Sequence, residues 1–370
     1  MNIVHVITGL GKGGAEGSLY RLIKNDSSSN IHTVISMMDF GYYGNKLLRH
    51  GVKVHILNFP RGSVKFKSLI KIFLVIKSTK PDVVQTWMYH ADLLGGIVAK
   101  ILRVKNILWG VRHSNIEKGK ISKFTRIIVR LCKMTSGFVP DKIVYNSKKS
   151  SEVHSDFGYN IKKLIVIPNG YNIEKYTISH SKLIQNKKKT IINIGMVARW
   201  NIQKDHHNLF QAMQIIDNTQ KYEWKLILAG SQMDGNNHYL MDMLDRFNIQ
   251  NKVELLGELM DIDTIYKQID LHILSSIGES FPNVVAESML SGIPNIVTDV
   301  GDSKYIVGDV GWLVPTSDHK TLALNIDGAL QEFFNNREKW IDRCKTSRKF
   351  ISQNFSIEKT LNQYQNIWHV

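Results

Sequence analysis

The fold is decided by one stretch of the sequence, Leu271-His272-Ile273-Leu274-Ser275-Ser276-Ile277-Gly278-Glu279-Ser280-Phe281-Pro282-Asn283-Val284-Val285-Ala286-Glu287. Its apolar start predicts a strand, and Pro282 fits the first position of a helix, where a missing N–H group costs nothing. We expect this helix to run from Asn283 to Leu290, with Glu279 on the preceding loop and Glu287 about one turn inside. The N–H groups at a helix start favour an anion. Two carboxylates beside them indicate a ligand with hydroxyl groups as well as phosphates, such as a nucleotide sugar.

The same alternation of short apolar strands and helical stretches runs through the whole chain and is typical of doubly wound parallel sheets. Strands are expected at Val4–Ile7, Thr33–Met37, Val52–Leu57, Val83–Thr86, Ile107–Trp109, Ile143–Tyr145, Leu164–Ile167, Ile191–Val197, Leu226–Ala229, Val253–Leu256, Leu271–Ser275 and Asn295–Thr298. We therefore predict an α/β protein of two Rossmann-like domains, whose strand ends would border a shared cleft.

The domain boundaries follow from a polar, basic run over Ser179–Lys189 that is typical of a linker. We predict an N-terminal domain over residues 1–180, a linker over 181–189 and a C-terminal domain over 190–354. Residues 355–370 hold a final helical stretch, Ser356–His369, which we expect to pack back towards the N-terminal domain. A length of 370 residues agrees with two domains.

Charge is unevenly distributed between the two halves of the chain. Residues 1–187 hold 30 Lys and Arg against 10 Asp and Glu, a net charge of +20, and residues 188–370 hold 18 against 22, a net charge of −4. The sum is the +16 of the whole chain. A basic first half attracts either an anionic membrane surface or nucleic acid. The interleaved aromatic and basic residues of a known RNA module are absent, so no nucleic-acid partner is expected.

The two cysteines, Cys132 and Cys344, lie far apart in the sequence, which argues against a disulfide framework and fits a reducing cytoplasm. The first residues lead directly into a strand, without the basic start and apolar run of a signal peptide. No stretch reaches the ~20 apolar residues of a membrane span. We expect a cytoplasmic protein at the inner face of the membrane.

Two loops that follow strands carry residues suited to phosphate chemistry. Thr8-Gly9-Leu10-Gly11-Lys12-Gly13-Gly14-Ala15-Glu16 allows close approach to a ligand, although its spacing is neither a dinucleotide fingerprint nor a phosphate loop. After the strand that ends at Val197, Arg199 and Lys204 follow on a loop leading into a helix. Cations at such a place can hold a diphosphate and stabilise it as it leaves.

Histidines follow two strand ends of the basic half, His90 after Val83–Thr86 and His113 after Ile107–Trp109. His90 either caps its helix or contacts an acceptor. The Asp261-Ile262-Asp263 triplet has the D-x-D form of metal-dependent transferases, but helix capping is the simpler account. Cysteines and histidines with zinc spacing are absent. We expect no metal and no other cofactor.

One basic segment has helical periodicity. Its apolar face is expected to comprise Ile121, Phe124, Ile127, Ile128 and Leu131, surrounded by Lys118, Lys120, Lys123, Arg126, Arg130 and Lys133. The segment Lys65–Lys77 is similar. Such helices either pack on their own sheet with a solvated basic face or lie on anionic lipid.

The spacing of Glu279 and Glu287 within its motif resembles the E-x7-E glutamate pair of the retaining glycosyltransferases of family 4, with the GT-B fold. Asn169-Gly170 after Ile165–Pro168 is also similar to the end of that family's first domain. The resemblance covers nearly the whole chain and implies transfer of a sugar from a nucleoside diphosphate donor.

The resemblance also implies roles for the candidate residues. Glu279 would contact the sugar ring, Glu287 the ribose hydroxyls, and Arg199 and Lys204 the departing diphosphate. Gly13 and Gly14 would lie against the diphosphate, and His113 near the point of transfer. The implied donor pocket also includes Ser280, Phe281 and Asn283, with Ser280 standing where the family often has glycine.

The expected reaction is therefore transfer of a hexose or N-acetylhexosamine from a nucleoside diphosphate sugar, with UDP preferred, to a glycan acceptor. A lipid-linked acceptor in bacterial surface polysaccharide synthesis fits the basic first half. A nucleotide-sugar epimerase or hydrolase on the same fold, or a nucleic-acid-binding protein, are the alternatives.

Overall fold

The computed structural model describes residues 1–60, 66–116, 121–179, 183 and 190–369. They form two compact units. The first unit comprises Met1–Tyr171 together with Phe355–Val370, and the second comprises Asn172–Asn354. The two units therefore divide after Tyr171, within the expected N-terminal domain. Most of the expected linker over 181–189 lies outside the described residues.

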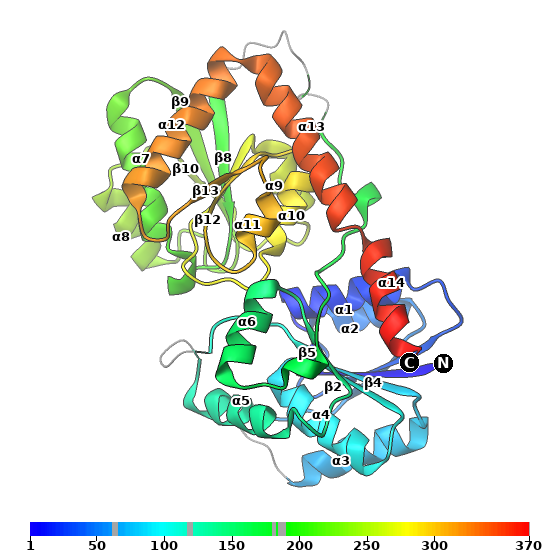
Figure 1. Ribbon diagram of the computed structural model, residues 1–370. Helices are drawn as coiled ribbons and strands as arrows, with labels where there is room; N and C mark the ends of the chain where they lie inside the picture. Colours follow the sequence, from blue (N-terminus) through cyan, green and yellow to red (C-terminus); the bar gives the residue numbers. More distant parts are fainter. Residues whose placement is uncertain (61–65, 117–120, 180–182, 184–189, 370) are drawn as a thin grey trace. The chain divides into compact units, whose positions relative to one another are not determined.

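The first unit is a parallel sheet flanked by helices (Figure 1). Its strands, in the spatial order β3-β2-β1-β4-β5-β6-β7, are β1 (Asn2–Ile7), β2 (Ile31–Ser36), β3 (Lys53–Ile56), β4 (Val83–Trp87), β5 (Asn106–Val111), β6 (Lys142–Tyr145) and β7 (Leu164–Val166). Its helices are α1 (Gly14–Asn25), α2 (Gly41–Arg49), α3 (Phe66–Thr79), α4 (Tyr89–Ile101), α5 (Lys123–Thr135), α6 (Lys148–Phe157) and α14 (Ile357–Trp368).

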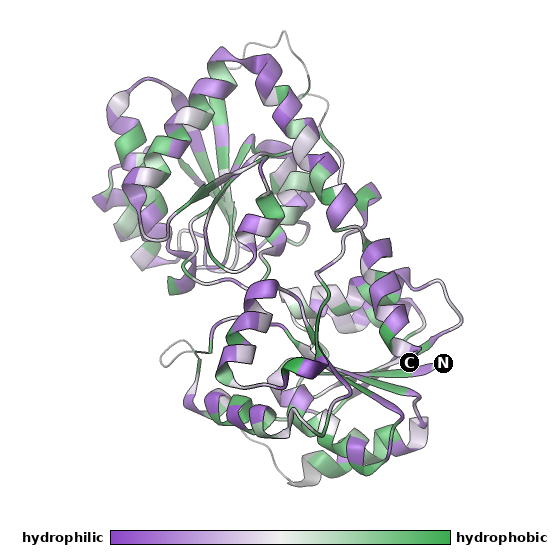
Figure 2. Cartoon of the chain, in the orientation of Figure 1, coloured by the Kyte–Doolittle hydropathy of each residue, from purple (hydrophilic) through white to green (hydrophobic). Residues whose placement is uncertain are grey.

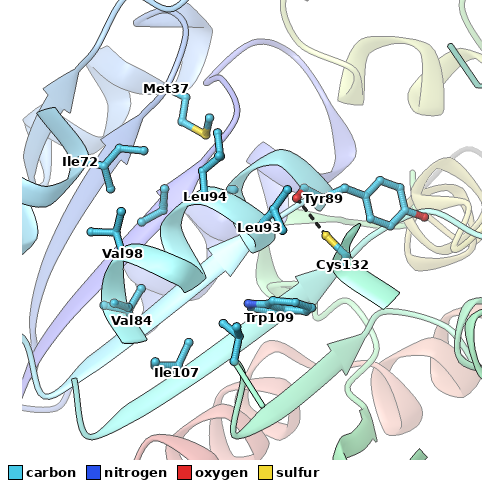
Figure 3. Packing of buried hydrophobic residues seen from close by; sticks show 14 of the residues in the cluster. Met37, Ile72, Val84, Tyr89, Leu93, Leu94, Val98, Ile107, Trp109 and Cys132 are labelled. Carbon is cyan, nitrogen blue, oxygen red and sulfur yellow. Dashed lines mark hydrogen bonds between the residues drawn. The ribbon is translucent and has the colours of Figure 1, made fainter. Parts of the chain in front are cut away.

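Successive residues of β1 face opposite cores, as the two-residue repeat of a strand requires. Val4 and Val6 belong to a core with α3, α4 and α5, whereas Ile3 and Ile7 belong to a core with α1 and α14. Figure 3 shows the first of these cores, in which the Cys132 thiol of α5 donates a hydrogen bond to the Tyr89 carbonyl at the start of α4. Both cysteines are buried and free.

Helix α14 returns from the end of the chain to pack on the first unit. It contacts α1, and its Tyr364 and Trp368 are buried in the core that contains Ile3 and Ile7. The amide of Asn106 in β5 donates a 2.7 Å hydrogen bond to the carbonyl oxygen of Ile367. These contacts bring the last helix and the first strand into one hydrophobic core, on the side of the sheet away from α4.

The second unit is also a parallel sheet flanked by helices (Figure 1). Its strands, in the spatial order β10-β9-β8-β11-β12-β13, are β8 (Ile191–Val197), β9 (Glu223–Ala229), β10 (Val253–Leu255), β11 (Leu271–Leu274), β12 (Asn295–Thr298) and β13 (Trp312–Val314). Its helices are α7 (His206–Thr219), α8 (His238–Arg246), α9 (Asp263–Gln268), α10 (Asn283–Leu290), α11 (Ser303–Val307), α12 (His319–Asn335) and α13 (Arg337–Asn354).

The prediction of two doubly wound parallel sheets is confirmed, and each expected strand is present within a few residues of its predicted bounds. Strand β13 was missed. Helix α10 runs from Asn283 to Leu290 as predicted, but Pro282 is not its first residue. Pro282 has an extended backbone, with φ −73° and ψ 96°, and occupies the N-cap position just before the helix.

The apolar face predicted for the basic segment around α5 is wrong in part. Ile128 is buried and Ile121 and Phe124 pack against the core, but Ile127 and Leu131 are exposed by 52% and 39%. Helix α5 therefore packs on its own sheet and carries a second apolar face. Lys118 and Lys120, and the side chains of residues 65–68, lie outside the described part of the chain. Within the described residues, no helix is both long and apolar enough to cross a bilayer.

Candidate functional site

The order of strands in the second unit creates a point at which the direction of winding reverses. Strand β8 lies between β9 and β11, so the connections from β8 and from β11 leave on opposite sides. Open α/β sheets bind ligands outside the carboxyl ends of the strands at such a switch point. Arg199 and Lys204 follow β8, and Glu279 follows β11. These loops, together with α10, form what we call the second-unit strand edge.

Lys204 and Glu279 meet at this edge, although 75 residues separate them. The Lys204 ammonium forms an ion pair with Glu279 Oε1, and the two side chains are exposed by only 18% and 12%. The Ser276 hydroxyl donates a 2.8 Å hydrogen bond to the same carboxylate oxygen. The cation and the carboxylate predicted to act together are thus held in contact, with Glu279 oriented by a serine that the sequence analysis did not single out.

Backbone hydrogen bonds join the two loops. The amide of Ile277 donates to the carbonyl of Gln203 at 2.8 Å. The Ser275 hydroxyl lies 3.0 Å from the carbonyls of both Lys204 and Asp205. Because these contacts tie the end of β11 to the loop after β8, the positions of Lys204 and Glu279 depend on each other.

Arg199 lies on the loop after β8 with an exposed side chain. The neighbouring amides of Ala198 and Trp200 donate to the carbonyls of Ala229 and Ser231, both at 2.9 Å, which fixes the backbone. Within the described residues, the Arg199 guanidinium has neither an ion-pair partner nor a hydrogen-bond acceptor. A cation in this setting can receive an anionic ligand without first leaving a protein partner.

Glu287 is 8% exposed and lies on the second turn of α10. Its Oε2 accepts a 3.3 Å hydrogen bond from the hydroxyl of Tyr266, which comes from α9. This contact has no local signal in the sequence, since Tyr266 precedes Glu287 by 21 residues. Tyr266 therefore positions one of the two predicted glutamates, as Ser276 does for the other.

The loop that carries Ser280 and Phe281 rests against the turn after β12. The amide of Asp302 donates to the Ser280 carbonyl at 2.9 Å. Gly301 has a φ of +56°, and a Cβ atom there would lie 2.6 Å from the carbonyl oxygens of Glu279 and Ser280. The close approach of this glycine lets the Glu279 loop fold over the end of β12. Asn283, the remaining predicted donor contact, begins α10 beside this loop.

The turn after Arg199 has a shape that the sequence did not predict. Asn201 Oδ1 accepts a 2.9 Å hydrogen bond from the amide of Gln203, and Asp205, at φ +47°, caps α7. The ring of Trp200 stacks on that of His206, with centroids 5.0 Å apart. Burial, reinforced by the Lys204 charge, lowers the pKa of His206 to about 3. A neutral histidine thus supports the loop that carries both cations.

In the first unit, the predicted residues follow β1, β4 and β5, which are neighbours in the sheet. We call these loops the first-unit strand edge. Gly13 caps α1 with an extended backbone, at φ −118°. A Cβ atom there would lie 2.1 Å from the Glu16 carboxylate, which is the end of a flexible side chain and would have to move. Burial, with the nearby Asp39 charge, raises the pKa of Glu16. Gly14 is exposed.

The two predicted histidines differ in their surroundings. His90 lies in the first turn of α4, where Met88 holds the cap position, and its ring stacks on Phe124 of α5 at 5.7 Å. Burial lowers the pKa of His90. His113 is exposed on the loop after β5, and its carbonyl accepts a 2.7 Å hydrogen bond from the hydroxyl of Ser150 in α6. Of the two interpretations of His90, the capping role is therefore wrong.

The buried carboxyl group of Asp92 contacts the strand ends at the first-unit strand edge. Its Oδ1 accepts hydrogen bonds from the Thr86 hydroxyl at 2.6 Å and from the amide of Gly110 at 3.0 Å. Burial raises the pKa of Asp92 to about 7. The side chain joins the ends of β4 and β5, from which the loops with His90 and His113 depart.

The aspartates considered for a metal have other contacts. Asp261 Oδ1 accepts a hydrogen bond from the amide of Asp263 at 3.2 Å, and Asp263 pairs with Lys175 at 3.7 Å. Among the described residues, no group of three or more His, Cys, Asp or Glu side chains could hold a metal ion. A reaction without a metal stays a prediction.

Two family models match the chain in succession. The glycosyl transferases group 1 model covers residues 176–347, and the glycosyltransferase family 4 model covers residues 12–175. The chain belongs to the group 1 glycosyltransferase family. Its enzymatic class, glycosyltransferase, follows from this membership, and the family to which the glutamate motif is similar is confirmed.

Two relatives align over most of the chain. The capsular polysaccharide biosynthesis glycosyltransferase CapM of Staphylococcus aureus is 27% identical over 81% of this chain and 81% of its own. The UDP-Gal:alpha-D-GlcNAc-diphosphoundecaprenol alpha-1,3-galactosyltransferase of Escherichia coli is 25% identical over 82% and 79%. Anabaena HepE, solved in complex with UDP-glucose, matches with a TM-score of 0.83 at 22% identity over 100% of both chains, which shows the shared GT-B fold.

Proposed function

We propose that this glycosyltransferase moves a hexose or N-acetylhexosamine from UDP to a glycan acceptor, with retention of the anomeric configuration. The observation that carries the proposal is the contact between Lys204 and Glu279 at the switch point of the second unit. A sugar donor needs a cation for its diphosphate and a carboxylate for its hydroxyl groups, and both are present there. UDP is supported by the E. coli relative, which is named for UDP-Gal, and by the UDP-glucose complex of HepE.

The second unit would bind the donor. Arg199, which is exposed, would meet the diphosphate first, and Lys204 would share its charge between Glu279 and the leaving phosphate. Positive charges aimed at the place where negative charge develops lower the barrier to departure of the nucleotide. These two cations would fill the role that a metal ion has in other transferases, so no cofactor is proposed.

Glu279 and Glu287 would contact different parts of the donor. Glu279 is held in place by Lys204 and Ser276 through Oε1, and its carboxylate would contact hydroxyls of the sugar ring. Glu287 is buried and is oriented by Tyr266, which suits a fixed contact with ribose hydroxyls. Ser280, Phe281 and Asn283 would complete the pocket on the loop and first turn of α10.

The first unit would bind the acceptor, with His113 near the point of transfer, His90 beside it, and Gly13 and Gly14 against the donor diphosphate. A lipid-linked glycan of bacterial surface polysaccharide is the proposed acceptor class. It is supported by the names of CapM and of the E. coli diphosphoundecaprenol enzyme. We also propose that the protein acts at the cytoplasmic face of the membrane, as a peripheral protein.

The test is thermal unfolding of the wild type and of Glu287→Gln against UDP, GDP, UDP-glucose and UDP-N-acetylglucosamine. A nucleotide at 100 times its dissociation constant stabilises the folded state by about 2.7 kcal/mol. We expect a shift with UDP and with at least one UDP-sugar, and a much smaller shift in Glu287→Gln. Because the substitution keeps the volume of the side chain, the unliganded melting temperature serves as the control. The absence of a shift with any nucleotide would contradict the proposal.

Two further readouts separate the finer parts of the proposal. Incubation of the shifting donor with isolated membrane glycolipid should give UDP and a product whose anomeric proton, measured by NMR, has the configuration of the donor. Inversion would overturn the retaining mechanism alone. Consumption of the donor at full rate without any acceptor would instead favour a hydrolase or an epimerase.

A further inference from the structure

Helix α5 has two apolar faces, and its own sheet uses only one of them. Ile128, Val129 and Cys132 are at most 5% exposed and pack in the core shared with α4, where Figure 3 shows Cys132 beside Tyr89. Ile127, Leu131 and Met134 are instead exposed by 52%, 39% and 71%. Their spacing of four and three residues places them on one side of the helix. This outer stripe covers no part of the described core.

Further exposed apolar side chains follow α5 in the sequence and occur on α3, which lies on the other side of α4 in the same layer. Phe138, just after the helix, is 60% exposed, and on α3 the side chains of Ile70 and Leu74 are exposed by 45% and 57%. Helix α4 contacts both α3 and α5, so that the three helices form one layer on the same face of the sheet. Figure 2 shows α3 as largely hydrophobic and α5 as a mixture of hydrophobic and hydrophilic turns. We call Ile70, Leu74, Ile127, Leu131, Met134 and Phe138 the outer apolar face.

Only positive charges occur in the two segments that carry this face. Residues 40–81 include nine Lys and Arg and no Asp or Glu, and residues 118–140 include six Lys and Arg and again no Asp or Glu. On α5, the side chains of Lys123, Arg130 and Lys133 are exposed. Apolar side chains bordered by cations, with no carboxylate among them, are the composition of a surface that lies on anionic lipid.

We propose that the outer apolar face is a docking surface for an anionic bilayer. The apolar side chains would enter the boundary between headgroups and acyl chains, about 5–10 Å deep, while the cations meet lipid phosphates. The inference deepens the proposed function, on which it rests for the lipid-linked acceptor. It also fits the position of α5, whose first turn contacts His90 through Phe124. The docking surface therefore begins at the first-unit strand edge, where a lipid-linked acceptor would arrive.

A second copy of the chain is a less suitable occupant of this face. In a symmetric dimer the same patch meets itself, so the cations of α5 would lie against those of the other α5 without a carboxylate between them. Like charges at short distance disfavour such a contact. An anionic bilayer instead supplies the missing negative charge.

The experiment measures flotation of the full chain with vesicles. One set contains equal parts of phosphatidylglycerol and phosphatidylcholine, and the other contains phosphatidylcholine alone. The test variant is Ile127→Ser/Leu131→Ser/Met134→Ser. The matched control is Ile31→Ser/Ile161→Ser/Leu324→Ser, which replaces three side chains that are 64%, 67% and 72% exposed elsewhere. Both variants are checked for an unchanged melting temperature and an unchanged shift with UDP.

The wild type and the control should float with the phosphatidylglycerol vesicles and much less with phosphatidylcholine, and added salt should weaken the binding. The test variant should partition at least about tenfold less, since it loses three inserted side chains. In Lys123→Gln/Arg130→Gln, each removed cation should weaken partitioning about fivefold. Equal flotation of the test variant and the control would overturn the proposal, as would a wild type that ignores phosphatidylglycerol.

A change in oligomeric state of the test variant, with flotation unchanged, would assign the face to a protein contact instead. Failure of the proposed function is distinguishable from failure of this inference. If the wild type floats but shows no thermal shift with any nucleotide, the docking surface is supported and the donor site is contradicted. If the wild type shows the thermal shift but does not float, the donor site is supported and the docking surface is contradicted.

Discussion

The two strand edges are built in different ways, although each lies at the carboxyl ends of a parallel sheet with the same kind of winding. At the second-unit strand edge, Lys204 pairs with Glu279 and the Tyr266 hydroxyl donates to Glu287, while Arg199 is exposed. At the first-unit strand edge, His113 and Gly14 are exposed. The difference indicates a prebuilt site for one substrate and a more open surface for the other. The proposed nucleotide sugar would need fixed contacts, whereas the proposed lipid-linked glycan would need room.

Buried titratable groups beneath the two edges differ as well. Under the second edge, His206 and His272 are kept neutral by burial, and the Lys204 charge lowers the pKa of both further. Under the first edge, burial raises the pKa of Asp92 to about 7, which keeps its carboxyl group protonated on the acid side of neutrality. Acidification therefore lowers the stability of the protein through His206 and His272 and raises it through Asp92.

The largest expected effect is on stability in acid. Burial lowers the pKa of His154, His206 and His272 to about 4, 3 and 4. The unfolded chain takes up these protons below about pH 6.5, so between about pH 7 and 5 each histidine removes about 2 kcal/mol of stability. Asp92 returns about 2 kcal/mol, because its folded carboxyl binds a proton that the unfolded one releases. For these groups the net expected loss is about 4 kcal/mol.

Urea denaturation over this pH range measures the loss directly. Among these four groups, only Asp92 stabilises the protein in acid, so the stability of Asp92→Asn should fall more steeply than that of the wild type. A stability that stays constant to about pH 5, or an unchanged slope in Asp92→Asn, would contradict this account of the buried groups.

The second prediction concerns the ion pair at the second-unit strand edge. Lys204→Ala removes a cation aimed at the leaving diphosphate, and such a loss costs about 100- to 1,000-fold in kcat. The matched control is Lys225→Ala, because Lys225 also pairs with a glutamate, Glu254, at 2.6 Å but with side chains that are 47% and 36% exposed. Steady-state release of UDP measures both variants. Equal rates in the two variants would show that the Lys204 pair is structural.

Much of this edge was predictable because its residues are close in sequence to strong local signals. The strand, Pro282 and the helix over Asn283–Leu290 located Glu279 and Glu287, and the end of β8 located Arg199 and Lys204. Tyr266 was not predictable, because no local pattern links it to a glutamate 21 residues later. Strand β13 was missed because it has only three residues, Trp312–Val314, between Gly311 and Pro315.

Helix α5 shows why helical periodicity alone did not predict which of its apolar residues are buried. Its apolar residues at 127, 128, 131 and 132 cover too wide an arc for one contact, and the sequence does not state which half meets the sheet. The structure divides them, with Ile128 and Cys132 inside and Ile127 and Leu131 outside. The same limit applies to Gly13, for which the sequence indicates a tight loop but not the Glu16 carboxylate that occupies the place of a side chain.

The third prediction tests the open edge. His113→Ala should reduce kcat/KM for the acceptor by about tenfold, as expected for the loss of one hydrogen bond to a charged or reacting group, and should leave the dissociation constant of UDP unchanged. His50→Ala is the control. His50 is also exposed in the first unit, and its Nε2 lies 3.0 Å from the Tyr20 hydroxyl. A weakened affinity for UDP in His113→Ala would place this residue with the donor and would blur the distinction between the two edges.

The smallest effect is expected from Tyr266→Phe. The ring is 1% exposed and stays in place, and the variant loses the hydroxyl that lies 3.3 Å from both Glu287 Oε2 and the Val284 carbonyl oxygen. A neutral donor to a carboxylate contributes about 1 kcal/mol, which corresponds to about a fivefold increase in the dissociation constant of UDP. Tyr159→Phe removes a buried hydroxyl that donates to the Val129 carbonyl in the first unit, at 3.1 Å, and is the matched control. Calorimetric titration with UDP separates them. If both variants bind UDP as the wild type does, Glu287 does not depend on Tyr266. If both weaken it equally, the effect is one of general stability, and the prebuilt character of the second edge then rests on the Lys204–Glu279 pair alone.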